Sequence, residues 1–232
     1  MKKVVVLTGA GMSADSGLKT FRESGGLWEG HDVGKVATPQ AWRKDPEKVL
    51  KFYNARRQQA HKAEPNEGHK ALARLEEKFD VTIITQNVDS LHERAGSSDV
   101  LHLHGQLSKA RSSEDASLIY DIGGDPIELG DTADDGAQLR PHVVWFGEGV
   151  PNMEKAVQIV PLAEILIVIG TSLVVYPAAS LTDYARSSIP KFIIDPNKPE
   201  LYDDSDWEHF EERAAVGTPK LVDQLIQNHA NS

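Results

Sequence analysis

The sequence predicts an α/β fold in which a doubly wound parallel sheet carries a small inserted module. Short runs of β-branched and aliphatic residues alternate along the chain with segments of helical periodicity, a pattern typical of strands joined by crossover helices. Several of these runs are apolar at nearly every position, as expected of parallel strands that helices cover on both faces. One segment, 108–139, interrupts the alternation with glycines and acidic residues.

The first expected strand is 4–7, a run of three valines and a leucine. Gly9 and Gly11 follow it almost at once, so the run is too short for a signal peptide and predicts a buried strand instead. The other expected strands are 81–84, 100–103, 143–146, 165–169 and 192–194.

Capping signals place the helices between these strands. Asp45 followed by Pro46 predicts a helix that extends to about Lys62. Asn66 is expected to cap the next helix, whose apolar residues recur at helical spacing, and Thr218 with Pro219 is expected to open the last one.

We expect a single domain over 1–232. Its core would comprise about 1–30, 80–107 and 140–232, and its small module of helices and loops about 31–79 and 108–139.

Composition narrows the function. The net charge of −10 argues against a nucleic-acid partner, because phosphate binding needs a basic surface. Cysteine is absent, which excludes disulfides, thiolate nucleophiles and cysteine-ligated zinc. The longest apolar run, 165–170, has the length of a strand rather than of a membrane span. We therefore expect a cytoplasmic protein with no membrane contact, and a monomer.

A glycine loop follows the first strand. Gly9, Gly11 and Ala14 match the spacing G-x-G-x-x-A, in which glycines let a pyrophosphate approach backbone N–H groups at a helix N-terminus. An acidic residue at the end of the second strand, the usual ribose partner, is missing. The loop alone leaves nucleotide binding and a plain tight turn equally open.

Polar residues also follow three other expected strands, as Thr85-Gln86-Asn87-Val88-Asp89, Gly170-Thr171-Ser172 and Asp195-Pro196-Asn197. Open α/β sheets bind ligands at the carboxyl ends of their strands, so these segments predict a crevice for ribose and phosphate beside the glycine loop. His104 comes at another strand end, before Gly105, and suits a general base. His102 shares its strand face, and His92 is expected to be structural.

Taken together, these segments resemble the sirtuins, the NAD-dependent protein lysine deacylases. The resemblance covers nearly the whole chain and rests on segments 9–22, 26–28, 85–96, 104–105, 140–148 and 170–172. It implies a Rossmann-like sheet, an NAD site along its edge, and a channel for acylated lysine in proteins or peptides. It also implies that nicotinamide is released and that the acyl group leaves as O-acyl-ADP-ribose.

The resemblance assigns roles to individual residues. It makes His104 the general base and Asn87 the second catalytic residue. It implies substrate contacts through Val143, Phe146, Gly147 and Glu148, which would pair with the peptide backbone as an added strand. The cofactor-binding residues that it implies are Gly9, Ala10, Gly11, Ser13, Asp15, Thr20, Phe21, Arg22, Trp28, Gln86, Asn87, Asp89, Gly170, Thr171, Ser172, Asp195 and Asn197.

Two departures from the family pattern matter. Sirtuins carry two cysteine pairs that bind structural zinc, whereas this chain has none and places Ser112 near the first position. We expect no zinc, and a module packed by Leu118, Ile119, Tyr120, Ile122 and Ile127. Asp195 stands where the family usually has Asn, and a carboxylate still accepts hydrogen bonds from ribose hydroxyls.

Tyr53 and Arg56 predict the acyl preference. They lie three residues apart on the helix after Asp45 and resemble the Tyr-x-x-Arg pair of the class III-like sirtuins, which prefer acidic acyl groups. We therefore expect a desuccinylase or demalonylase with weaker deacetylase activity, in which Arg57 tolerates substitution. A non-catalytic NAD or ADP-ribose sensor and an ADP-ribosyltransferase remain alternatives, although a sensor has no need of His104.

Overall fold

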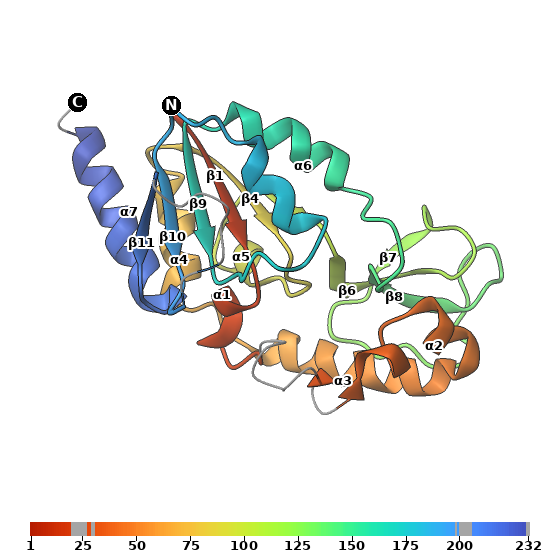
Figure 1. Cartoon of the computed structure of the whole chain (residues 1–232). Helices are drawn as coiled ribbons and strands as arrows, with labels where there is room; N and C mark the ends of the chain where they lie inside the picture. The colour runs from red at the N-terminus through yellow and green to blue at the C-terminus, as the bar shows by residue number, and fades with distance from the viewer. Residues whose placement is uncertain (20–26, 29–30, 198, 200–205, 231–232) are drawn as a thin grey trace.

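A six-stranded parallel sheet forms the larger part of the protein in this computed structural model, which describes residues 1–19, 27–28, 31–197, 199 and 206–230 (Figure 1). The strand order is β11-β10-β9-β1-β4-β5. Their bounds are β1 Lys3–Thr8, β4 Asp80–Thr85, β5 Val100–His102, β9 Ile165–Ile169, β10 Lys191–Ile194 and β11 Trp207–Phe210. This order confirms the predicted doubly wound sheet, because the chain builds outward from β1 first on one side and then on the other.

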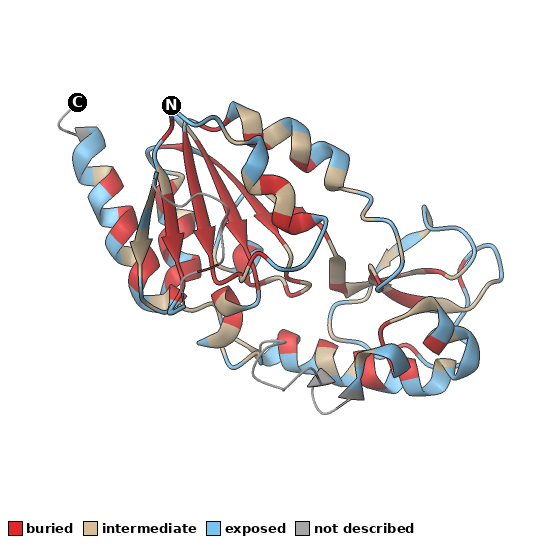
Figure 2. Ribbon diagram, viewed as in Figure 1, coloured by how far each residue is buried: buried red, intermediate tan, exposed pale blue. Residues whose placement is uncertain are grey.

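Helices cover both faces of this sheet, as its uninterrupted apolar strands require. Val4 and Val6 of β1 face α4 (Glu67–Leu75) and α7 (Ala214–Ala230). Val5 and Leu7 alternate to the other face, where they pack with α6 (Met153–Ile159) and the 3₁₀ helices η2 (Val160–Leu162) and η3 (Ala178–Tyr184). Figure 2 shows the central strands β1, β4 and β9 buried along almost their whole length, apart from the first residues of β1 and β4.

A second, smaller lobe lies beyond β5. It contains α2 (Pro39–Lys44), α3 (Pro46–Lys62) and a three-stranded antiparallel sheet of order β7-β6-β8. These strands are β6 Gly105–Ser112, β7 Ile119–Asp121 and β8 Leu139–Val143. A short 3₁₀ helix η1 (Val33–Lys35) and the two-residue strands β2 (Leu27–Trp28) and β3 (His31–Asp32) precede α2.

Caps predicted from the sequence set the start of two helices. The Asp45 carboxylate accepts a hydrogen bond from Lys48 N, and Pro46 occupies the first turn of α3. Asn66 accepts from Gly68 N and His69 N, while His69 Nδ1 accepts from Asn66 N, which completes a capping box at the start of α4.

Three packing arrangements differ from the expectation. The segment 143–146 is not a strand of the large sheet, because β8 ends at Val143 and pairs with β6 in the small one. Residues 108–139 are more regular than expected, since they carry most of β6 and all of β7. α4 was expected in the small module but packs against the large sheet through Leu72 and Leu75.

Smaller differences concern single elements. β11 was not predicted, because its sequence Trp-Glu-His-Phe has two polar residues between two aromatic ones and lacks the apolar run of the central strands; it lies at the edge of the sheet. α7 begins at Ala214, so Pro219 lies inside the helix instead of opening it. Ile119 is 44% exposed and does not pack the module, whereas Ile127 is 1% exposed and does.

The two sides of the sheet diverge at the carboxyl ends of β1 and β9, where their loops meet. Gly170 after β9 has φ +61, and a Cβ there would lie 2.3 Å from Met12 N. Glycine is thus required where the two loops touch. Among the described helices, none combines the length and the apolar character that crossing a bilayer requires.

Candidate active site

A cavity of about 650 Å³ opens between the carboxyl edge of the large sheet and the small lobe. Its volume is in the range of small-molecule sites. It brings together nearly all the side chains that the sequence predicts for a site: Gly9, Ala10, Gly11, Ser13, Asp15, Tyr53, Arg56, Gln86, Asn87, Asp89, His104, Val143, Phe146, Gly147, Glu148, Gly170, Thr171, Ser172, Asp195 and Asn197.

The remaining predicted residues belong to the segment after Lys19. Thr20, Phe21 and Arg22 lie outside the described residues. The backbone of Trp28 forms part of β2, and its side chain is not described.

Two glycine-containing loops form the floor of the cavity. Gly9 N donates to Ile169 O at 3.0 Å, and Gly11 N donates to Gly170 O at 2.8 Å. A Cβ on Gly11 would lie 2.7 Å from Gly170 Cα. These two glycines therefore serve the close packing of the loops, and their N–H groups are not free for a phosphate as the motif suggested.

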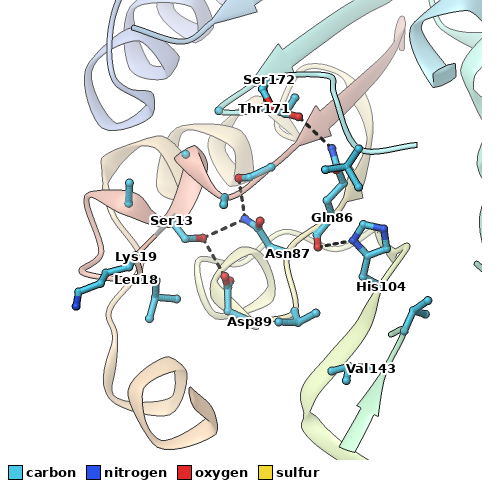
Figure 3. Close-up of a pocket in the computed structure, with 18 of the residues that line it drawn as sticks. Ser13, Leu18, Lys19, Gln86, Asn87, Asp89, His104, Val143, Thr171 and Ser172 are labelled. Carbon is cyan, nitrogen blue, oxygen red and sulfur yellow. Dashed lines mark hydrogen bonds between the residues drawn. The ribbon is translucent and has the colours of Figure 1, made fainter. Parts of the chain in front are cut away.

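Polar side chains from three strand ends meet above this floor (Figure 3). Asn87 Nδ2 donates to Gly9 O at 3.0 Å and to Ser13 Oγ at 3.2 Å. Ser13, in the short helix α1 (Gly11–Ala14), donates to Asp89 Oδ2 at 3.0 Å. Gln86 Nε2 reaches across to Thr171 Oγ1 at 3.2 Å. The loops after β1, β4 and β9 are thus joined directly by side-chain hydrogen bonds.

Asp89 is a carboxylic acid only 7% exposed. Burial raises its pKa above the ordinary value, although hydrogen bonds from Leu91 N and Ser13 Oγ work in the opposite direction. The bond from Leu91 N ties Asp89 to the start of the short helix α5 (Leu91–Arg94).

His104 is held with one ring nitrogen committed. Its Nδ1 lies 3.0 Å from Gln86 O, and because a carbonyl can only accept, Nδ1 carries the proton. The neutral ring then has its lone pair on Nε2. Burial lowers the pKa of His104 below its ordinary value, although the bond to Gln86 raises it slightly. A neutral imidazole with an available nitrogen is the form that a general base needs.

Carboxylates flank the other end of the cavity. Asp195 Oδ1 accepts from Asn197 N at 2.8 Å, which orders the turn after β10. Asp15 accepts from Arg213 Nη1 at 3.0 Å, and this bond joins the loop after α1 to the residue that precedes α7. No sequence signal points to Arg213, which follows no motif and reaches the cavity only through the packing of α7.

Tyr53 and Arg56 project from α3 into the small-lobe side of the cavity. Tyr53 is 1% exposed and packs edge-on against Phe52. Burial raises the pKa of Tyr53 above its usual range, while the charge of Arg56 and a hydrogen bond from Trp145 act against that rise. The phenol hydroxyl therefore stays protonated as a hydrogen-bond donor, with a guanidinium close to it.

Trp145 and Glu148 shape the wall opposite α3. The Arg140 guanidinium lies 3.3 Å from the centre of the Trp145 ring and donates to both oxygens of Glu148, at 2.8 and 3.1 Å. Glu148 also accepts from Trp145 N at 2.8 Å. The Glu148 side chain thus holds the loop 145–148 in place, and the predicted pairing of this loop with a peptide concerns its backbone.

Arg57 differs from its neighbour Arg56. It is 1% exposed, and its Nε donates to Leu107 O at 2.6 Å while Nη1 donates to Asn54 Oδ1 at 2.6 Å. The expectation that Arg57 tolerates substitution is therefore wrong, because its loss would leave a buried carbonyl unsatisfied.

Several lining residues were missed. Leu18 and Lys19 border the cavity near α1, and Val174, Val175, Tyr176 and Pro177 border it after Ser172. The run that follows Ser172 could have been noticed in the sequence, because it contains the apolar residues Val174 and Tyr176. Both remain exposed in the structure. Among the described residues, no three His, Asp or Glu side chains gather as a metal site.

Comparison with known proteins places this geometry in a family. The model of the Sir2 family matches residues 9–177. A protein named NAD-dependent protein deacylase from Helicobacter pylori strain J99 is 52% identical over 227 residues, covering 98% of this chain and 97% of its own. Another of that name, from Bacteroides thetaiotaomicron, is 49% identical over 231 residues, covering 97% and 99%.

A solved complex of a Sir2 homologue with NAD superposes with a TM-score of 0.89 at 40% identity, and the match covers 98% of this chain and 91% of the other. The family match spans more than half of the chain, and the two relatives match over almost their whole length. This chain belongs to the Sir2 family, the sirtuins.

Proposed function

We propose that this NAD-dependent protein deacylase prefers succinyl- or malonyl-lysine and acts more weakly on acetyl-lysine. The observation that carries the proposal is the position of Tyr53 and Arg56, which line the same cavity as His104. The acyl group of a lysine that enters from the small-lobe side would end beside them, while its amide carbon lies toward His104.

The residues of the sheet edge would hold NAD. The donors and acceptors there suit ribose hydroxyls and an amide: Gln86, Asn87, Ser172 and Asn197, with carboxylates at Asp89 and Asp195. When bound there, NAD would supply an electrophilic carbon at its nicotinamide ribose and nicotinamide as the leaving group.

The protein's own contribution is proton handling and orientation. His104 keeps its proton on Nδ1 through Gln86 O, so its Nε2 lone pair would be available to accept a proton from a cofactor hydroxyl. Asn87 and Ser13 anchor the loops after β4 and β1 to each other. The walls formed by Leu107, Val143 and Trp145 are apolar and exclude water from the reacting group.

The charges around α3 support the acidic acyl preference. Arg56 brings a guanidinium to the cavity, and the buried Tyr53 hydroxyl adds a neutral donor. The nearby carboxylate of Glu148 is already bonded to Arg140. A terminal carboxylate two or three carbons from the amide would accept bidentate bonds from Arg56 and a third bond from Tyr53.

The test is Arg56→Met, assayed by nicotinamide release with succinyl- and acetyl-lysine versions of one peptide. Loss of the guanidinium should lower kcat/KM for the succinyl peptide. By analogy with a broken charge pair, the loss should correspond to on the order of 2–5 kcal/mol of activation free energy. Deacetylation should be retained.

Lys51→Met is the matched control, since this exposed residue of the same helix does not line the cavity. It should leave both activities unchanged. Equal loss of the two activities in Arg56→Met, or a wild-type preference for acetyl-lysine, would contradict the proposal. Nicotinamide release that needs no acyl-lysine would instead favour an ADP-ribosyltransferase.

A further inference from the structure

The turn formed by Gln86 and Asn87 is held through all four of its backbone polar groups. Gln86 N donates to Thr8 O at 2.9 Å, and Asn87 N donates to Thr85 Oγ1 at 3.0 Å. The two carbonyls accept from histidines: Gln86 O from His104, and Asn87 O from His102 Nδ1 at 3.0 Å. His102 and His104 therefore donate hydrogen bonds to two successive carbonyls of the neighbouring loop.

The two histidines differ in what surrounds their second ring nitrogen, Nε2. His104 Nε2 belongs to a ring that lines the cavity, whereas His102 Nε2 lies 2.7 Å from Glu93 Oε1. Burial alone would raise the pKa of Glu93, but its hydrogen bond with His102 and the charge of that ring lower the pKa overall. Glu93 is then ionised and can only accept, so His102 donates from both nitrogens.

This chain of bonds returns to the loop from which it starts. Glu93 belongs to α5, whose first residue, Leu91, donates from its N–H to the Asp89 carboxylate at 3.1 Å. The His102 side chain is 7% exposed, and its own carbonyl accepts from Asn152 Nδ2 at 2.7 Å. The ring is therefore fixed on its backbone side and on both nitrogens.

We propose that His102 and Glu93 are positioning residues of the deacylase, because their bonds fix the turn that presents Gln86 and Asn87 to the nicotinamide end of the cavity. This inference rests on the proposed role of Asn87. Without His102, Asn87 O would be buried and unbonded, and the turn would move to find another donor. A displacement of about 1 Å near reacting groups costs roughly 100-fold in rate.

Conservative replacements separate positioning from stability. Asn at position 102 places its Nδ2 close to where Nδ1 lies, so His102→Asn keeps the donor to Asn87 O, whereas His102→Leu removes it. Gln at position 93 can donate to His102 Nε2, so Glu93→Gln leaves the proton on Nδ1, whereas Glu93→Leu does not support it.

The experiment measures nicotinamide release from NAD in the presence of an acyl-lysine peptide. It gives kcat and the KM values for NAD and for the peptide, and the melting temperature of each variant is measured beside them. We expect about a 10- to 100-fold lower kcat for His102→Leu and Glu93→Leu. His102→Asn and Glu93→Gln should stay within a few-fold of wild type, and KM for the peptide should not change. If His102→Leu fails to fold, the Glu93 pair still provides the test.

Leu101→Ala is the control, because Leu101 is a buried residue of β5 whose side chain belongs to the apolar core on one face of the large sheet and carries no hydrogen-bonding group. It should lower the melting temperature without lowering kcat at a temperature where it is folded. The inference fails if kcat follows melting temperature across all five variants, or if Asn and Leu at position 102 give the same kcat.

Asn87→Ala separates the failure of this inference from the failure of the proposed function. If Asn87→Ala keeps full turnover, the proposed role of Asn87 is wrong. If Asn87→Ala is inactive while His102→Leu is active, only the positioning role of His102 is overturned.

Discussion

At the scale of single residues, the contacts of Nε2 distinguish the two histidines beside the site. His102 and His104 are two residues apart and each donates from Nδ1 to a loop carbonyl. The Nε2 of His102 lies against the carboxylate of Glu93. The ring of His104 lines the cavity, and burial lowers its pKa, as the proposed role of general base requires.

The pH profile tests this assignment of His104. The reaction needs the neutral imidazole, so activity is full above the His104 pKa and falls as the pH drops through it. Because burial lowers that pKa, we expect the acid limb of kcat/KM to lie below pH ~6.5, the ordinary value for histidine. Asn at position 104 keeps a donor for Gln86 O but no base, so His104→Asn should fold and lose ~10²–10⁴-fold in rate. An acid limb at or above the ordinary histidine value would exclude His104 as the titrating group.

At the scale of the element, α3 distributes two consecutive arginines to two different environments. Neighbouring residues on a helix point about 100° apart, so Arg56 reaches the cavity while Arg57 reaches β6. The same helix thus carries the proposed specificity residue Arg56 on one face and the structural charge of Arg57 on the next. Burial lowers the pKa of Arg57 to about 10, which still leaves it charged at neutral pH.

Substitution of Arg57 should therefore affect stability rather than acyl choice. Arg57→Met leaves Leu107 O buried without its donor, which costs about 1–3 kcal/mol of unfolding free energy. Arg56→Met should cost less, because its side chain is only partly buried. Urea unfolding of the two variants measures the difference, and an Arg57→Met protein as stable as wild type would refute the structural role.

At the scale of the whole molecule, two buried histidines join α4 and α5 beneath the large sheet. The rings of His69 and His92 lie 4.8 Å apart, edge to face, and are 0% and 1% exposed. Burial lowers the pKa of His69 to about 4 and that of His92 well below its ordinary value. Both rings are therefore neutral in the folded protein at neutral pH.

These histidines predict sensitivity to acid. Below pH ~6.5 the unfolded chain binds protons that the folded chain does not. Their contribution to stability is therefore complete above that pH and is lost progressively as the pH falls toward 4. For His69 the loss reaches up to about 3 kcal/mol.

The variant His69→Gln tests this, because glutamine at the third helical position preserves the capping box with Asn66 and does not titrate. Its unfolding free energy should depend less steeply on pH between 6.5 and 4 than that of wild type, as measured by urea unfolding at a series of pH values. Parallel profiles for the two proteins would show that His69 is not the group responsible.

The sequence by itself determined the elements whose signals are local. Apolar runs located β1, β4, β9 and β10, and the caps Asp45 and Asn66 located α3 and α4. The site motifs follow strand ends directly, so their convergence on one cavity also followed from the parallel sheet.

Tertiary structure alone decided the rest. The apolar run 143–146 reads like a core strand, yet the pairing of β8 with β6 places it in the small lobe. The order of residues singled out Arg56 and His104 but not the hydrogen-bond partners of Arg57, His102 and His104, because Leu107, Glu93 and Gln86 come from other elements. Local patterns fix where a helix or strand lies, whereas the identity of a hydrogen-bond partner depends on which segments the fold brings together.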